Sequence, residues 1–262
     1  MSKSVGIIGC GWLGMPLAQT LINNGFSVFG STTTFEKLSE MENMGISACI
    51  LNFKDEKDYP PEMDIFNTDF LVVNFPPKRN KDVLISYPKQ IQKLIKSVKK
   101  PSVKVIFISS TSVYPSTNDW VTEVDAFQPE KPSGKAILLA EGIMKSNFKE
   151  NLTILRPGGL FGPGRDFRVF LEKNINPQNA DLPLNMVHQK DCIEIIHQII
   201  EKDCFNEVLN VVCDKAVTRR EIFQMDKKIK ISILPNSYKL VDNSRIKKVI
   251  DYEFIVKNPL SM

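Results

Sequence analysis

Short apolar runs alternate along this chain with longer segments in which apolar residues recur at helical spacing. The apolar runs predict strands at residues 5–9, 25–31, 46–53, 69–75, 103–110, 151–157 and 207–212. The intervening segments predict helices at residues 12–24, 35–44 and 83–99, around Lys135, at residues 192–201 and from about residue 218. Regular alternation of this kind indicates an α/β protein with a Rossmann-type, doubly wound parallel sheet joined by right-handed crossovers.

The pattern loosens after Gly158, where glycine and proline cluster in PGGLFGPG. We therefore predict a Rossmann domain at residues 1–160 and a small C-terminal substrate lobe at residues 161–262, with the two interleaved. Ligands of doubly wound sheets bind outside the carboxyl ends of the strands. The lobe is accordingly expected to cover that edge of the sheet.

The first strand leads into a glycine-rich turn, GIIGCGWLG, with Gly9, Gly11 and Gly14 in G-x-G-x-x-G spacing. In such turns the first glycine permits the tight bend, the second lets the backbone approach a pyrophosphate, and the third lets helix and strand pack closely. The start of the following helix offers unpaired N–H groups to the phosphates. The turn predicts a dinucleotide cofactor, and the alternative is a glycine turn with a structural role only.

The end of the second predicted strand bears on which dinucleotide would bind. NAD sites usually carry Asp or Glu there, which binds the ribose hydroxyls. Here the strand ends in the letters GSTTT, and the first acid is Glu36. Ser31, Thr32 and Thr33 could donate hydrogen bonds to a 2′-phosphate, and Lys37 is close enough in the sequence to reach it. The pattern favours NADP over NAD, although a run of hydroxyls is also typical of a turn into a helix.

Composition narrows the remaining classes of protein. The 262 residues are 42% hydrophobic and 24% charged, which is ordinary for a soluble globular protein, and the net charge is only +4. Basic residues such as Lys96, Lys99 and Lys100 lie at predicted helix ends, where cations are favourable. We therefore expect solvated faces and no nucleic-acid surface.

Five cysteines without a C-x-x-C motif or close pairing are typical of a reducing compartment. We expect a cytoplasmic protein with no disulfide framework and no metal site. The apolar N-terminal stretch is interrupted by Gln19 and Asn23. It is therefore expected to belong to the fold, and neither a signal peptide nor a membrane span is predicted.

Four segments together resemble one enzyme family. They are GCGWLG (residues 9–14), FISSTSVYP (107–115), LRPGGLFGPGR (155–165) and VHQKD (187–191). In this combination the chain is similar to the extended short-chain dehydrogenase/reductases, the group that includes nucleotide-sugar epimerases and dehydratases, and within it to an atypical branch. The resemblance runs over nearly the whole chain. It implies an NADP or NAD cofactor, a small-molecule substrate and a tendency to form homodimers.

Members of that family use a Ser or Thr together with Tyr-x-x-x-Lys. The Tyr and Lys lie one helical turn apart on the same face, and the ammonium lowers the pKa of the phenol so that it can shuttle a proton during hydride transfer. Ser110 matches the family's serine, but the segment SGKAILLAE places Ser133 at the tyrosine position and Ile137 at the lysine position. If Lys135 is taken as the lysine, Lys131 falls at the tyrosine position. None of the five tyrosines is followed four residues later by lysine.

The family's dehydratases also carry an Asp-Glu pair directly after the Ser or Thr. Here these positions are Thr111 and Ser112, so that route of dehydration has no evident proton path. Tyr114 lies near the predicted carboxyl edge and is the alternative proton donor, although this tyrosine is usually structural in the family. Arg165 and Arg168 are the candidate groups for binding a phosphate or carboxylate.

The predicted site residues fall into three groups. The catalytic candidates are Ser110 and Tyr114. The substrate candidates are Ser112, Ser133, Arg165 and His188, where the alternative for the histidine is a hydrogen-bonded structural role. The cofactor candidates follow the carboxyl ends of the strands and are Gly9, Gly11, Trp12, Leu13, Gly14, Ser31, Thr32, Thr33, Asn52, Phe53, Asn74, Pro76, Ser109 and Pro157.

Two functions remain open at this point. In the first, the protein is an atypical NAD(P)-dependent oxidoreductase or epimerase on a small, nucleotide- or phosphate-bearing substrate. Ser110 would orient a carbonyl group, and another group or a water would relay the proton. In the second, it is a dinucleotide-sensing or scaffold protein that has lost redox chemistry. The absent Tyr/Lys pair favours the second, whereas the intact turn, Ser110 and the lobe motifs favour the first, which we adopt as the hypothesis.

Overall fold

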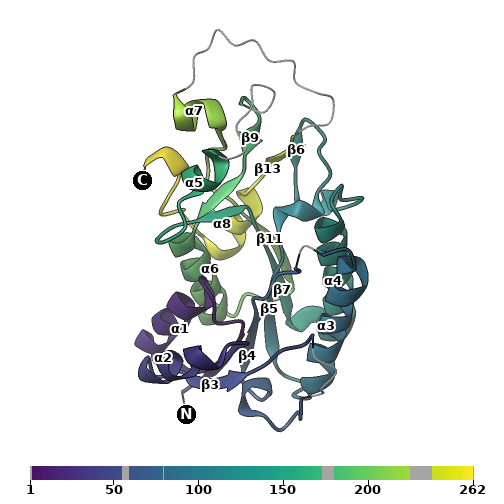
Figure 1. The fold of residues 1–262 in the computed structure, drawn as a ribbon, viewed down its shortest axis with the longest axis vertical. Helices are drawn as coiled ribbons and strands as arrows, with labels where there is room; N and C mark the ends of the chain where they lie inside the picture. The colour runs from purple at the N-terminus through teal and green to yellow at the C-terminus, as the bar shows by residue number, and fades with distance from the viewer. Residues whose placement is uncertain (1, 55–58, 79, 173–179, 225–237, 262) are drawn as a thin grey trace.

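A seven-stranded parallel sheet forms the centre of the molecule (Figure 1). The computed structural model describes residues 2–54, 59–78, 80–172, 180–224 and 238–261. In spatial order the strands are β11 (Glu207–Val211), β7 (Leu152–Pro157), β5 (Lys104–Ile108), β4 (Phe70–Val73), β1 (Ser4–Ile8), β2 (Ser27–Thr32) and β3 (Ser47–Ile50). The order reverses between β1 and β4, which makes that position the topological switch point. The predicted Rossmann-type sheet is confirmed.

Helices cover both faces of the sheet (Figure 1). One face carries α1 (Gly14–Asn23), α6 (Gln189–Glu201) and α8 (Ser244–Ile250), whose apolar side chains share one buried cluster with β1 and β11, and α2 (Leu38–Asn43) contributes Met41 to it. The other face carries α3 (Val83–Ser97) and α4 (Pro132–Phe148), which pack on β4 and β5 in a second cluster. Burial on both faces explains why the strands read as continuous apolar runs in the sequence.

Short elements build the lobe above the carboxyl edge of the sheet (Figure 1). Three small strand pairs are β8 (Gly159–Phe161) with β10 (Met186–His188), β9 (Pro183–Leu184) with β12 (Val217–Thr218), and β6 (Trp120–Val121) with β13 (Leu240–Val241). Its helices are α5 (Phe167–Glu172) and α7 (Arg219–Phe223). Elsewhere in the described residues, single-turn helices occur at η1 (Phe35–Lys37), η2 (Asp64–Phe66), η3 (Thr111–Val113), η4 (Glu123–Asp125), η5 (Lys149–Asn151) and η7 (Pro259–Ser261).

The predicted elements of the sheet and its helices occur at their predicted places, with ends that shift by a few residues. One such shift is at α6, which begins at Gln189 and not at residue 192, because the imidazole of His188 accepts a hydrogen bond from the Lys190 N–H and caps the helix. The domain boundary at residue 160 stays a prediction. The sheet itself crosses it, since β11 pairs with β7.

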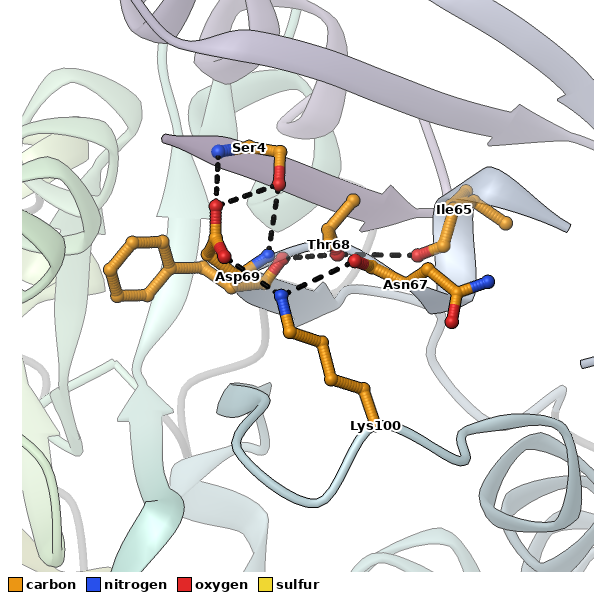
Figure 2. Close-up of polar contacts among 7 residues, drawn as sticks. Ser4, Ile65, Asn67, Thr68, Asp69 and Lys100 are labelled. Atoms are coloured by element: carbon orange, nitrogen blue, oxygen red, sulfur yellow. Dashed lines mark hydrogen bonds and ion pairs between the residues drawn. The ribbon is translucent and has the colours of Figure 1, made fainter. Parts of the chain in front are cut away.

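The amino edge of the sheet is closed by a polar cluster at the start of β4 (Figure 2). The Asp69 carboxylate accepts hydrogen bonds from the N–H of Ser4 at 2.8 Å and from its hydroxyl at 2.9 Å, which ties the loop to β1. Lys100 donates to the other carboxylate oxygen of Asp69 at 2.8 Å. Thr68 donates to the carbonyl of Phe70 at 2.7 Å. These groups form hydrogen bonds with one another at the amino edge of the sheet. We therefore look for the ligand site at the carboxyl edge.

In the part of the chain that the structure describes, no helix is both long and apolar enough to cross a membrane.

Candidate functional site

The three glycines of the turn between β1 and α1 have three different surroundings. Gly9 has a φ of +105°, and a Cβ there would lie 2.7 Å from the carbonyl oxygen of Asn74. A Cβ at Gly14 would lie 2.4 Å from the carbonyl oxygen of Gly9, so the helix start packs directly on the bend. A Cβ at Gly11 would have no atom within 4 Å other than those of its two chain neighbours. The bend and the packing are therefore fixed, and the space over Gly11 is open.

The start of α1 offers backbone donors beside that open space. The N–H groups of Trp12 and Leu13 have no hydrogen-bond acceptor among the described residues, whereas Met15 donates to Gly11 at 2.9 Å and begins the helical pattern. An uncapped helix start carries partial positive charge and binds anions. Asn74, at the end of β4, holds the turn in place because its side-chain amide donates to the Gly9 carbonyl at 3.1 Å. Pro76 is exposed two residues further on.

The hydroxyls at the end of β2 divide into buried and exposed groups. Ser31 is 2% exposed, and its oxygen accepts a hydrogen bond from the Gly9 N–H at 3.1 Å. Thr32 is also buried, and its oxygen accepts from the Thr34 N–H. Both side chains are buried and support the turn, and a role for Ser31 and Thr32 in cofactor binding stays a prediction. Thr33 is exposed.

The ends of β3 and β4 meet in an aromatic cluster. Phe53 is buried and stacks on Phe75 with ring centroids 5.7 Å apart. The Asn52 N–H donates to the hydroxyl of Tyr59 at 2.6 Å. Phe53 thus packs as a core residue, while a role for Asn52 in cofactor binding stays a prediction.

Two adjacent serines at the end of β5 have opposite roles. The hydroxyl of Ser109 is buried and donates to the carboxylate of Glu141 on α4, and a cofactor contact of this residue stays a prediction. Ser110 is half-buried, and its oxygen accepts a hydrogen bond from the Ser112 N–H at 3.1 Å. An oxygen that accepts in this way still keeps its own proton. Ser110 can therefore donate to a ligand.

Tyr114 lies in the core, where its contacts argue against the predicted role as a proton donor. The residue is 1% exposed. Its hydroxyl donates to the side-chain oxygen of Asn210 at 2.5 Å and accepts from the Arg156 guanidinium at 2.9 Å. Burial raises the pKa of Tyr114 to about 12. A phenol held by two buried partners at that pKa has no free proton to give to a ligand.

Arg156 joins this network to α4. Its guanidinium makes two parallel hydrogen bonds to the carboxylate of Glu141, at 2.9 Å and 2.6 Å, and a further one to the carbonyl of Glu123 at 2.8 Å. The ion pair is almost fully buried, with 2% and 1% of the two side chains exposed. Arg156 is therefore buried in this ion pair and has a structural role. Pro157, the next residue, is buried at the end of β7.

The first turn of α4 packs against the segment that carries Ser110. A Cβ at Gly134 would lie 2.3 Å from the carbonyl oxygen of Ser112. Ser110, Ser112 and Ser133 therefore come together at the carboxyl end of β5. Ser133 is the residue that the resemblance predicted at the family's tyrosine position, and that assignment stays a prediction.

Lys239 is a charged residue at this end of the site that sequence reasoning missed. Its ammonium donates to the carbonyl of Tyr114 at 2.8 Å. Burial lowers the pKa of this lysine below its ordinary value. The contact spans 125 residues of sequence, and no motif near Lys239 indicates it.

Arg165 and His188 lie elsewhere, at a pocket in the lobe of about 540 Å³ whose lining includes neither Ser112 nor Ser133. The guanidinium of Arg165 stacks over the ring of Trp12 at 5.2 Å. The indole N–H of Trp12 donates to the carbonyl of Pro163 at 2.8 Å. The four predicted substrate residues thus form two groups, and Trp12 of the glycine turn contacts the second group through Arg165.

Comparison with solved structures places this architecture in a known class. The chain is similar to UDP-glucuronic acid 4-epimerase from Bacillus cereus, solved in complex with NAD, with a TM-score of 0.75, 18% identity and coverage of 97% of this chain and 94% of that one. It is also similar to dTDP-glucose 4,6-dehydratase from Bacillus anthracis in complex with NAD, with a TM-score of 0.74, 15% identity and coverage of 97% and 92%. The chain therefore shares the Rossmann-type fold of these two solved structures.

Sequence comparison gives a narrower relationship. Protein YeeZ of Escherichia coli K12 is 30% identical over 275 residues, which span 99% of this chain and 98% of YeeZ. The chain belongs to the family of YeeZ. No family model matches it.

Proposed function

We propose that this protein binds a nicotinamide dinucleotide across the glycine turn. The observation that carries the proposal is the open space over Gly11, which lies beside the unpaired N–H groups of Trp12 and Leu13 at the switch point of the sheet. The two solved structures described above hold NAD, which supports the same class of cofactor.

We further propose that NADP is preferred over NAD. Thr33 and Lys37 are exposed after β2. Glu36 is the first carboxylate there, and its side chain is also exposed. A hydroxyl and an ammonium suit a 2′-phosphate, whereas NAD sites place a carboxylate at the strand end itself.

The reaction proposed for this site is oxidoreduction or epimerisation of a small substrate, one that carries a nucleotide or a phosphate group. The cofactor supplies the acceptor and donor of hydride. Ser110 donates a hydrogen bond to the reacting oxygen, and Ser133 lies at the adjacent start of α4. Lys239 is our candidate for the cation of the absent Tyr/Lys pair, because its pKa lies below that of free lysine and its ammonium contacts the segment that follows Ser110.

The first test is titration of the purified protein with NADPH and NADH, followed by nicotinamide fluorescence and thermal shift. We expect micromolar binding of NADPH and weaker binding of NADH. The double variant Thr33→Val, Lys37→Gln should weaken NADPH and leave NADH unchanged. If neither form binds at millimolar concentration, the proposal fails. If NADH binds more tightly, only the preference for NADP fails.

Turnover is tested separately on the bound reduced cofactor. Oxidation of NADPH by a panel of keto-sugar nucleotides and phosphorylated carbonyl compounds would support the reaction. Binding without turnover on any of them would instead match the catalytically degenerate sensor considered above. A cytoplasmic location and a homodimer stay predictions.

A further inference from the structure

The pocket that holds Arg165 and His188 lies between four segments of the lobe. They are the loop at residues 161–168, the start of α6, the end of α7 and the C-terminal residues Pro259 and Leu260. Its volume of about 540 Å³ falls within the range of pockets for small molecules. None of the three turn glycines lines it.

The charges in this pocket do not balance. Of its two carboxylates, Asp166 pairs with Arg168 at 2.9 Å and Glu221 pairs with Lys215 at 3.0 Å. The remaining cations of the lining, Arg165 and Lys190, have no carboxylate within ion-pair distance among the described residues. The pocket therefore presents two uncompensated positive charges.

His188 adds a directed donor. The side chain is 1% exposed, and its Nδ1 accepts a hydrogen bond from the Lys190 N–H at 3.1 Å. Burial lowers the pKa of His188, which favours the neutral imidazole. A neutral imidazole that accepts at Nδ1 carries its proton on Nε2. Nε2 lies 3.3 Å from the position of a Cβ on Gly162 and has no acceptor among the described residues.

The rest of the lining is apolar. Phe161 meets both Phe167 and His188 edge to face, with centroids 5.0 Å apart in each case. Ile222 and Leu260 complete the apolar wall. Apolar walls with a few convergent polar groups are the usual composition of a small-molecule site.

We propose that this pocket binds a small organic anion with an apolar body, at a site separate from the glycine turn. Arg165 and Lys190 neutralise the carboxylate or phosphate, the His188 N–H donates to it, and the phenylalanines contact the apolar part. The inference rests on the pocket alone and does not require the proposed reaction.

Trp12 provides the reporter for a test. The chain has two tryptophans, and the other, Trp120, is 58% exposed on β6. In a Trp120→Phe variant the fluorescence comes from Trp12, whose ring edge lies 3.4 Å from the Cβ position of Gly162 at the pocket. The probes are benzoate, phenyl phosphate and uncharged benzyl alcohol, titrated without cofactor. The two anions distinguish a carboxylate site from a phosphate site.

We expect saturable quenching or enhancement by at least one anion, and binding of benzyl alcohol weaker by about tenfold or more, because a charge-assisted hydrogen bond contributes at least that factor. Lys190→Gln and Arg165→Gln should each weaken the anion about tenfold. Lys89→Gln, which removes an exposed charge from α3, is the matched control and should have no effect. Calorimetry repeats the titration for Arg165→Gln, since that side chain contacts the reporter.

Three results would overturn the proposal. They are the absence of saturation by either anion at millimolar concentration, equal affinity for benzyl alcohol, and unchanged affinity in both Lys190→Gln and Arg165→Gln. The titration is also repeated at saturating NADPH. Loss of anion binding under that condition would place the probe in the cofactor cleft and would contradict a separate site. Because the main titration contains no cofactor, its outcome is independent of whether NADPH binds.

Discussion

The two ends of the carboxyl edge are built in different ways. At the end near α1, the geometry comes from backbone: three glycines, one tight bend and the first N–H groups of a helix. At the end near α4, the family resemblance predicts a tyrosine and a lysine, and at the positions it predicts for them the sequence has Ser133 and Ile137. The sequence therefore has the whole glycine pattern at the first end and lacks the predicted tyrosine and lysine at the second.

This difference shows which residues of a site are also required for the stability of the fold. The positions of Gly9 and Gly14 cannot change without backbone collisions, so the stability of the protein preserves them together with the turn. Ser110, Ser133 and Lys239 meet no such constraint, since each could be replaced by a residue of similar size. Chemistry that depends on side chains can therefore change while the architecture remains.

At the end of the carboxyl edge near α4, replacing Ser110 should give the largest loss of turnover. We expect Ser110→Ala to reduce turnover by about 10²–10³-fold, which is typical for removal of one donor to a reacting oxygen, while NADPH affinity is kept. Steady-state kinetics and fluorescence titration measure the two quantities. Ser109→Ala is the matched control: it should reduce stability, because the buried Glu141 loses a donor, and leave turnover per folded molecule unchanged. Equal turnover in Ser110→Ala and wild type would exclude a chemical role for Ser110.

At the end of the carboxyl edge near α1, replacing Gly14 should give the largest loss of stability. A Cβ 2.4 Å from the Gly9 oxygen forces the bend to move, and we expect Gly14→Ala to cost about 2–3 kcal/mol of the free energy of unfolding. Gly11→Ala is the control, because nothing other than its two chain neighbours lies within 4 Å of the added methyl. It should change stability by less than about 1 kcal/mol and yet weaken NADPH, since the methyl takes up space needed by the pyrophosphate. Urea denaturation compares the stability of the two variants. Equal destabilisation would contradict the view that Gly14 serves packing and Gly11 serves cofactor binding.

Removing the phenol of Tyr114 distinguishes a structural tyrosine from a catalytic one. Tyr114→Phe leaves the buried Asn210 oxygen without its donor and Arg156 without one acceptor. We expect a loss of about 1–2 kcal/mol in the free energy of unfolding, with turnover and NADPH affinity unchanged. A variant of wild-type stability with no turnover would instead restore Tyr114 as a proton donor.

The smallest effect is expected at the opposite edge of the sheet, in the cluster around Asp69 (Figure 2). Hydrogen bonds from Lys100 and Ser4 lower the pKa of Asp69 from 3.8 to about 2. Because the folded-state pKa lies below the unfolded value, the stabilisation is present above about pH 4 and is lost as the pH falls toward about 2. The Asp69 side chain is 44% exposed, so solvent screening limits the contribution to about 0.5–1 kcal/mol.

Denaturation of wild type and Asp69→Asn across this pH range measures the contribution directly. The difference between them should be largest near neutral pH and should disappear at the acidic end. A difference that grows as the pH falls would have the wrong sign for this carboxylate. High salt should reduce the difference at neutral pH, because the pair is exposed.

Sequence patterns were sufficient for the elements of the central sheet and for the glycine turn, because both are encoded locally. Strand β1, the bend at Gly9 and the start of α1 lie within a few residues of one another, so spacing alone predicts their geometry. The sequence was less informative about the choice between NADP and NAD, because it does not show which hydroxyls after β2 are exposed. Two of the three candidate hydroxyls, Ser31 and Thr32, turned out to be buried against the turn.

The remaining differences between prediction and structure come from contacts between distant residues. Tyr114 is placed in the core by Asn210, which lies 96 residues away, and no local pattern distinguishes a buried phenol from an exposed one. The paired strands of the lobe are two or three residues long, too short to show periodicity. Arg165 and His188 were assigned to the substrate, but only the fold shows that they share a pocket away from Ser133.

The pairing of β6 with β13 has a consequence for the order in which the protein forms during synthesis. Residues 118–121 form hydrogen bonds with the segment at residues 238–242. This part of the lobe, next to Tyr114, can therefore form only after residue 242 has been synthesised. The neighbouring strands β1 to β5 are complete once residue 108 has emerged, and domains generally fold from the N-terminus as they are made. A ribosome-bound chain would therefore have a finished glycine turn long before Lys239 arrives to complete the opposite end.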